Sequence, residues 1–106
     1  MKKIALSENG RKTGEFFDPD KATQFKEETF HDGSNFISKA TGSQWNHSAL
    51  YRTASGNWVL NTYSNYQGSV ETYEIISNAE AARWFVKSEY EEIPEELKEE
   101  ILSLEV

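Results

Sequence analysis

The sequence contains no cysteine, which removes several classes of protein at once. Without thiols there is no disulfide scaffold, no thiol catalysis, no iron–sulfur cluster and no thiolate zinc site. Only two histidines are present, and neither stands at a ligand spacing typical of a metal site. We therefore expect no metal and no cofactor, and any chemistry has to use oxygen and nitrogen groups.

Long hydrophobic runs are also absent. No apolar segment approaches the roughly 20 residues that a membrane-spanning helix needs. The first six residues begin like a signal peptide, but the chain turns polar at Ser7, Glu8 and Asn9. The sequence thus favours a cytoplasmic protein that does not associate with membranes.

The chain does contain enough apolar surface for one small domain. It has 106 residues, of which 37% are hydrophobic and 13% are aromatic. A chain of this length and composition can bury a core large enough to offset the entropy of ordering. We expect a single domain over residues 1–106 that folds alone.

Charge is strongly segregated along the chain. The net charge is -7, yet residues 1–88 carry ten acids and ten bases, whereas residues 89–106 carry eight Glu and one Lys. Because no basic cluster is present, duplex nucleic acid is disfavoured as a partner. The acidic segment is either a solvated helix face or a mimic of nucleic-acid charge that docks on a basic protein. The second role would fall to Glu92, Glu95, Glu96, Glu99 and Glu100.

Hydrophobic periodicity and turn signals predict an α+β fold, with a β-rich part over residues 1–76 and a helical part over residues 77–105. The β-rich part should form an antiparallel meander of about five or six short strands, covered on one face by a helix. Strand-like runs cover residues 3–6, 13–17, 23–29, 36–39, 49–53, 58–64 and 70–76. Residues 21–24 are ambiguous, because Asp18 and Pro19 suit either a turn or the start of a helix.

The helix that covers the sheet is expected over residues 78–88. Ser77 and Glu80 have the spacing of a capping box, in which each side chain satisfies a free backbone amide of the first turn. The stripe that should lie across the sheet consists of Ala81, Phe85 and Ser88, flanked by Ala82 and Trp84.

A second, acidic helix is expected over residues 94–104. Pro94 suits the first helical turn, and the glutamates that follow it suit the positive end of the helix dipole. Leu97, Ile101 and Leu104 recur at helical spacing and give this segment an apolar stripe. Whether it packs on the domain or detaches stays open.

The middle third of the chain is neutral, polar and aromatic. Between residues 33 and 69 only Lys39 and Arg52 are charged. Aromatic faces beside amide edges suit stacking on a base, a sugar or a peptide. The predicted binding surface comprises Gln44, Trp45, Asn46, His47, Arg52, Tyr63, Tyr66 and Gln67. The alternative is that the tryptophans fill the core while the amides satisfy the backbone of loops.

A catalytic interpretation of the same segment uses His47, Arg52 and Tyr51. These are the residue types of a thiol-free ribonuclease, with acid–base groups and a cation for the phosphate. Nothing in their spacing requires that role, and exposed turn histidines are the alternative. No residue is therefore assigned as catalytic, and the three are kept only as candidates.

Two groups of residues resemble a pattern found in small bacterial, plasmid and phage proteins of unassigned function. The first group is Leu50-Tyr51-Arg52-Thr53, Gly56-Asn57-Trp58-Val59-Leu60, Ile75-Ile76-Ser77 and Glu80-Ala81-Ala82-Arg83-Trp84. The second group is Asp32-Gly33, Asn35, Ile37-Ser38, Ala40-Thr41-Gly42-Ser43-Gln44-Trp45, His47 and Gln67-Gly68-Ser69. The resemblance implies a bacterial or mobile-element origin and a small sheet with a packed helix, and it carries over no catalytic residue. Phe36 and Tyr63 depart from the pattern, which puts a shared ligand in doubt.

We therefore expect a non-enzymatic accessory protein that binds a protein partner through the neutral aromatic surface or through the acidic helix. Inhibition of a nucleic-acid enzyme is a specific version of this function, by analogy alone. The alternatives are a small nuclease or hydrolase, and a module that stacks on single-stranded nucleic acid or a small ligand. The oligomeric state stays open.

Overall fold

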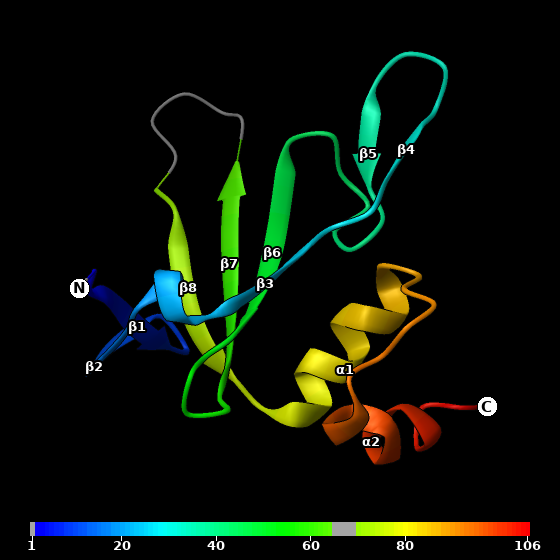
Figure 1. Ribbon diagram of the computed structural model, residues 1–106. Helices are drawn as coiled ribbons and strands as arrows, with labels where there is room; N and C mark the ends of the chain where they lie inside the picture. Colours follow the sequence, from blue (N-terminus) through cyan, green and yellow to red (C-terminus); the bar gives the residue numbers. More distant parts are fainter. Residues whose placement is uncertain (1, 65–69) are drawn as a thin grey trace.

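The computed structural model describes residues 2–64 and 70–106, and within them the predicted α+β class and its two helices are confirmed. Figure 1 shows the sheet on one side and the two helices packed together on the other. The strands are β1 (Ile4–Glu8), β2 (Arg11–Phe17), β3 (Thr23–Lys26), β4 (Thr29–His31), β5 (Phe36–Ser38), β6 (Asn46–Arg52), β7 (Trp58–Ser64) and β8 (Thr72–Ile76). The α-helices are α1 (Asn78–Lys87) and α2 (Lys98–Leu102), and short 3₁₀ turns cover Pro19–Lys21 and Glu95–Leu97.

The strand order departs in part from the expected meander. The main sheet has the order β2-β1-β8-β7-β6-β3, while β4 and β5 form a separate hairpin. Strands β6, β7 and β8 follow one another as antiparallel neighbours, as expected. However, β1 lies parallel to β8, and β3 crosses to the far edge to pair with β6. The sheet is therefore mixed, with one parallel pair at the point where β1 joins it.

Residues 23–29 form two strands rather than the single strand expected. Strand β3 ends at Lys26 and β4 begins at Thr29, with Glu27 and Glu28 between them. The Glu27 carboxylate turns inward onto the backbone of β6, and the Glu28 carbonyl accepts a 2.8 Å hydrogen bond from the Lys39 amide. Because these two residues bond to other parts of the chain, they do not continue the strand.

The ambiguity at residues 21–24 is resolved by a short helical turn followed by a strand. The Asp18 side chain caps the 3₁₀ turn Pro19–Lys21 by accepting from the Asp20 amide, and Pro19 is its first residue. Strand β3 then begins at Thr23. Pro19 therefore opens a helical turn, as its fixed φ favours, but the turn ends before residue 22.

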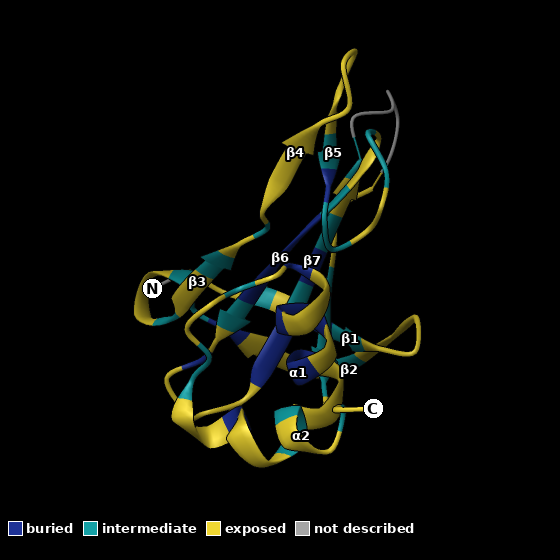
Figure 2. Cartoon of the chain, turned by 90° about the vertical axis from the view of Figure 1, so that its right-hand side faces the viewer, coloured by how far each residue is buried: buried dark blue, intermediate teal, exposed yellow. Residues whose placement is uncertain are grey.

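The principal core lies between α1 and the face of the sheet that carries Trp58 and Leu50. The Phe85 ring of α1 meets the Phe25 ring at 5.0 Å and the Trp58 ring at 5.8 Å, both edge to face. The predicted stripe of α1 is confirmed, since Ala81, Ala82, Trp84, Phe85 and Ser88 are all buried. Figure 2 shows this burial where β6, β7 and α1 meet. At the helix start the Ser77 hydroxyl accepts from the Glu80 amide at 3.2 Å, as the capping prediction requires.

A smaller core occupies the opposite face of the sheet. Leu6 and Phe17, from β1 and β2, cover Val59, and the Phe17 ring lies 5.3 Å from the Tyr51 ring and 5.8 Å from the Tyr73 ring. Since successive residues of a strand point to opposite faces, Val59 lies on the face away from α1. The β1–β2 hairpin covers this face only near one end of β7, so the end where β6 begins is left uncovered by it.

The C-terminal segment packs on the domain. Leu97 is 0% exposed and belongs to the principal core, with Tyr90 and Ile93 packed beside it. Two ion pairs join the segment to the rest of the chain: Arg52 with Glu96, and Lys39 with Glu89 at 2.6 Å. The regular helix is shorter than the expected 94–104, because Pro94 is extended and a 3₁₀ turn precedes α2. The turn directs Leu97 into the core.

We predict that the Leu97→Ala substitution lowers the free energy of unfolding by about 2–5 kcal/mol, the usual cost of removing a fully buried leucine side chain. Leu102→Ala is the matched control, because Leu102 is 68% exposed and its truncation should cost about 0.5 kcal/mol or less. Chemical denaturation of the two variants measures the difference. Equal midpoints would show that the C-terminal segment does not contribute to the core.

Candidate functional site

Part of the predicted binding surface assembles at one end of the sheet. The pairing of β6 with β7 places Asn46 opposite Ser64 and His47 opposite Tyr63. Gln44 and Trp45 directly precede β6, and the β4–β5 hairpin projects beside them (Figure 1). We call this region the aromatic end, comprising Gln44, Trp45, Asn46, His47 and Tyr63, with Phe30 and Phe36 of the hairpin.

One of the predicted binding residues, Arg52, is not found there. Arg52 lies at the other end of β6, opposite Trp58, and forms an ion pair with Glu96. The side-chain spacing of a strand puts it about 16 Å from His47 and on the other face. Tyr66 and Gln67 lie outside the described residues.

A buried carboxylate holds the aromatic end together. The Glu27 side chain is 7% exposed, and its oxygens accept from the Ser48 amide at 3.0 Å, from the Ser38 hydroxyl, and from His47 Nδ1 at 2.5 Å. These three donors come from β5 and β6, while Glu27 itself follows β3. Burial of a carboxylate is costly unless its oxygens are hydrogen-bonded, and three partners meet this requirement for Glu27.

His47 takes part in this network through both ring nitrogens. Nδ1 faces Glu27, and Nε2 lies 3.0 Å from the Gln44 carbonyl oxygen. Both partners are oxygen atoms, so the ring is held from two sides. The imidazole also stacks on Tyr63, with ring centroids 5.7 Å apart and planes at 26°. His47 is therefore a structural member of the network rather than a base facing a substrate.

Nothing in the sequence identified Glu27 as a member of the site. It is one of two adjacent glutamates, twenty residues before His47, and no motif connects it to that histidine. Only the pairing of β3 with β6, which places Lys26 opposite Ala49, brings the Glu27 side chain to the start of β6.

Large aromatic side chains remain exposed around this network. Trp45 is 43% exposed, Tyr63 37% and Phe36 67%, and Phe30 is also exposed. Trp45 therefore does not fill the core, in contrast to Trp58, which is fully buried. The aromatic end combines ring surface with a backbone that the Glu27 contacts hold in place.

The adjoining open face of the sheet carries further tyrosines. Tyr73 donates a 3.1 Å hydrogen bond to the Glu71 carboxylate, and the buried Asn61 amide donates to the same oxygen at 3.0 Å. Burial, together with the bond to Glu71, raises the pKa of Tyr73 to about 12. Burial, followed by the nearby Glu27 and Glu71 carboxylates, also raises the pKa of Tyr63. Both hydroxyls therefore stay protonated at neutral pH, and the Tyr73 hydroxyl hydrogen is used in its bond to Glu71.

A shallow groove runs beside Tyr63. Its volume is about 330 Å³, and its lining includes Gln24, Lys26, Glu27 and Ala49. The groove combines a ring with amide, ammonium and carboxylate groups. Such a mixture suits a peptide better than a single charged ligand.

The candidate catalytic residues do not form a common site. His47 and Tyr51 share one face of β6, and Arg52 lies on the other. The Tyr51 hydroxyl accepts from the Gln24 side-chain amide at 3.0 Å, and its ring packs on Phe17. Each of the three is thus bound to a different part of the protein, and no acid, base and cation converge there.

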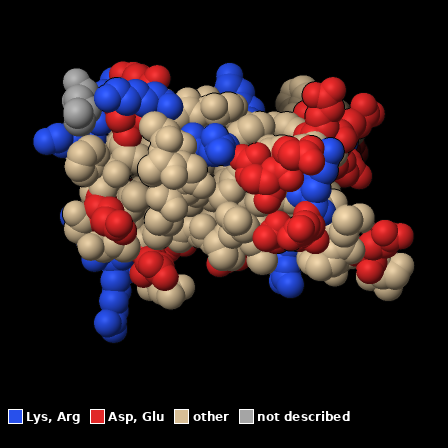
Figure 3. Space-filling view, turned by 60° about the horizontal axis from the view of Figure 1, so that its bottom comes forward, with Lys and Arg blue, Asp and Glu red and all other residues tan. Residues whose placement is uncertain are grey.

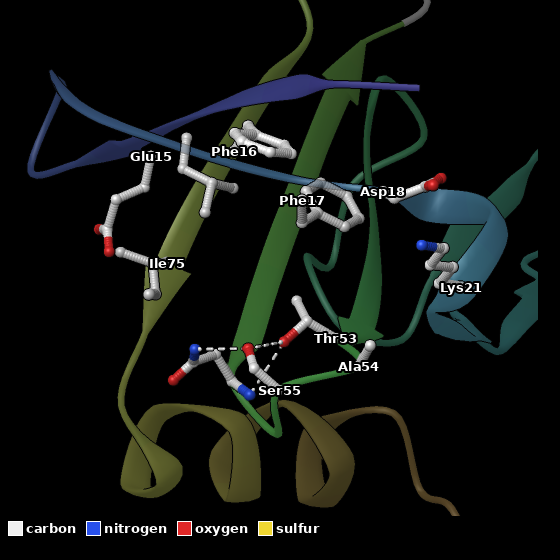
Figure 4. A pocket seen from close by; sticks show the side chains of 11 residues that line it. Glu15, Phe16, Phe17, Asp18, Lys21, Thr53, Ala54, Ser55 and Ile75 are labelled. Atoms are coloured by element: carbon white, nitrogen blue, oxygen red, sulfur yellow. Dashed lines mark hydrogen bonds between the residues drawn. The ribbon is translucent and has the colours of Figure 1, made fainter. Parts of the chain in front are cut away.

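A separate pocket of about 310 Å³ lies at the opposite end of the sheet (Figure 4). Phe16, Phe17 and Ile75 supply apolar surface, and the β6–β7 turn closes it. The turn's polar groups bond to each other: the Asn57 amide donates to the Thr53 hydroxyl at 3.0 Å, and Ser55 lies 3.2 Å from Thr53. These hydroxyls stabilise the turn, and the charged residues that line the pocket are Glu15, Asp18 and Lys21.

No group of three or more potential metal-ligating side chains occurs among residues 2–64 and 70–106. In the same part of the chain no helix is both long enough and apolar enough to cross a bilayer. Comparisons of the chain with protein-family models, with curated proteins and with solved structures found no match.

We predict that His47→Ala lowers the free energy of unfolding by about 1.5–3 kcal/mol, because it removes one hydrogen-bonding partner of the buried Glu27 carboxylate. The control is Glu28→Gln, which neutralises the neighbouring, exposed carboxylate and should change stability by about 0.5 kcal/mol or less. Urea denaturation at neutral pH measures both variants. If the two curves coincide, the Glu27 to His47 contact is not a structural element of the site.

Proposed function

We propose that this chain is a non-enzymatic, cytoplasmic accessory protein that binds a protein partner at the aromatic end. The observation that carries the proposal is the exposure of Trp45, Tyr63 and Phe36 at one end of the sheet, above a buried carboxylate network. Exposed rings on a rigid backbone lose little entropy on binding and are typical of the residues that dominate interfaces.

Polar edges beside these rings support a protein partner. Asn46 and Tyr63 are both exposed, so a side-chain amide and a hydroxyl border the rings. Interfaces place aromatic side chains at the centre and hydrogen-bonding groups at the rim, with charged residues depleted from the centre. The aromatic end has this composition, since it consists of aromatic and amide side chains and the His47 imidazole, whose Nδ1 contacts Glu27.

The acidic C-terminal segment favours a second, narrower version. Of its five predicted contact residues, Glu96 is paired with Arg52 and Glu95 with Lys98. Within the described chain no ion pair involves the other three, Glu92, Glu99 and Glu100. Figure 3 shows acidic side chains gathered on the side of the molecule where α2 lies. In this version the partner is a nucleic-acid enzyme whose basic site these carboxylates occupy.

The alternatives have weaker support. A nuclease needs His47, Arg52 and Tyr51 together, and these residues lie apart. A module that stacks on single-stranded nucleic acid would use the same rings, but a groove binding the backbone of such a strand is usually basic. Lys26 is the one cation that lines the described groove beside Tyr63, and Glu27 lies next to it.

The proposal predicts that Trp45→Ala weakens partner capture by tenfold or more, because a central interface tryptophan contributes about 2 kcal/mol or more. The matched control is Phe16→Ala, which removes a similarly exposed ring at the far end of the sheet. The measurement is quantitative pull-down from a bacterial lysate, followed by titration of the purified partner against each variant.

Three outcomes separate the hypotheses. If partner capture is lost in Trp45→Ala but not in Phe16→Ala, the partner binds at the aromatic end. If capture is lost only in the triple variant Glu92→Gln, Glu99→Gln and Glu100→Gln, the partner binds at the acidic segment instead. The proposal is contradicted if all variants capture the same partner equally well. It is also contradicted if no protein is captured and a single-stranded oligonucleotide quenches Trp fluorescence in a salt-sensitive way.

A further inference from the structure

A pocket that the proposed function does not use lies between α1 and the helix-covered face of the sheet. Its volume is about 260 Å³. Apolar surface comes from Leu60 of β7, Ile76 at the end of β8, Trp84 of α1 and Ala40 of the loop before β6. Thr62 of β7 lies on the same face as Leu60 and also lines it. Most of this lining is apolar, so the body of a ligand that fits it is apolar as well.

Two cations stand at the rim of this pocket. Arg83 and Lys87 lie four residues apart on α1, so their side chains lie on one face of the helix. Both are exposed, and in the described parts of the chain neither forms an ion pair. Glu80 also lines the pocket, but its carboxylate accepts from the Ser77 hydroxyl at 3.3 Å at the start of the helix. The rim is therefore net positive on a protein whose net charge is -7.

Three polar side chains of the pocket, those of Trp84, Ser48 and Thr41, already have hydrogen-bond partners. Trp84 Nε1 donates to the Ser48 hydroxyl at 2.9 Å, and the Thr41 hydroxyl donates to the Asn46 carbonyl at 2.5 Å. The indole is therefore satisfied, and what it offers a ligand is ring surface. Two features are left for recognition: an apolar interior, and a guanidinium and an ammonium at its mouth.

We propose that this pocket binds a small aromatic carboxylate. The ring lies against Trp84, Leu60 and Ile76, and the carboxylate meets Arg83 and Lys87. The volume is near the lower end of that of small-molecule sites, which limits the ligand to one or two fused rings. A guanidinium suits a carboxylate because it can donate two parallel hydrogen bonds to it.

The probe for this site is 2-naphthoate, and 2-naphthamide is its uncharged counterpart of the same shape. Binding is followed by the shifts of the backbone and indole N–H signals in two-dimensional NMR spectra of the full chain. We expect 2-naphthoate to shift the signals of Trp84, Leu60 and Ile76, and 2-naphthamide to bind at least tenfold more weakly. One charge-assisted contact is sufficient for this ratio.

The charge dependence is tested with the double variant Arg83→Gln and Lys87→Gln. It should weaken 2-naphthoate binding at least tenfold and leave 2-naphthamide unchanged. The matched control is Arg11→Gln with Lys12→Gln, which removes the same two residue types from exposed positions on β2. It should change the affinity for each of the two ligands by no more than twofold. Thr62→Phe, which fills the pocket and keeps both cations, should abolish binding of both ligands.

Several results overturn the proposal. One is the absence of shifts at Trp84, Leu60 and Ile76 at millimolar 2-naphthoate. Others are equal affinity for the acid and the amide, equal affinity in the two double variants, and undiminished binding in Thr62→Phe. None of these results bears on the aromatic end, because Trp45, Tyr63 and Phe36 do not line this pocket.

Discussion

The Glu27 carboxylate lies where three segments of the chain meet. It follows β3, accepts a hydrogen bond from the Ser38 hydroxyl at the end of β5, and accepts two more from Ser48 and His47 in β6. Each contact replaces water that the carboxylate loses on burial, and hydrogen bonds to a charged group are among the stronger ones in proteins. The positions of the β4–β5 hairpin and of the loop before β6 both depend on this side chain.

The two faces of the main sheet are covered by different elements. The face that carries Trp58 is closed by α1 and by Leu97 of the C-terminal segment. The opposite face is closed by β1 and β2 only near Val59. At the aromatic end, rings are consequently exposed while the backbone beneath them is held by the contacts of the buried Glu27 side chain. This combination of rigidity and exposure distinguishes a binding surface from a loosely packed loop.

Local features of the fold could be predicted from the sequence. The Ser77 cap, the buried stripe of α1 and the β6–β7 hairpin all depend on residues close together in the chain, and all three are present. The placement of β3 beside β6, and of β1 beside β8, depends on contacts between distant segments. No local pattern encodes those contacts, so the order of the strands could be predicted only in part.

The candidate site, too, could be predicted only where it depends on residues close together in the chain. Trp45 and Tyr63 could be predicted because they are aromatic residues in a neutral, polar segment, whereas only closeness in sequence connects Arg52 with them. Strand alternation and the length of β6 place Arg52 at the other end, where Glu96 pairs with it. Charge likewise suggested a solvated or detachable C-terminal segment, whereas the burial of a single leucine, Leu97, determines where it packs. No sequence pattern predicts the role of Glu27, because that role arises only from the pairing of β3 with β6.

The central claim is that the Glu27 carboxylate holds the start of β6, and exchange of the Ser48 amide hydrogen tests it most directly. This amide donates to Glu27, whereas Leu50, two residues further along, lies in the core of the sheet. In Glu27→Ala the account predicts that exchange at Ser48 accelerates by tenfold or more, as loss of a charged hydrogen bond implies, while exchange at Leu50 changes much less. Exchange at Ser48 that stays at the wild-type rate would contradict the account.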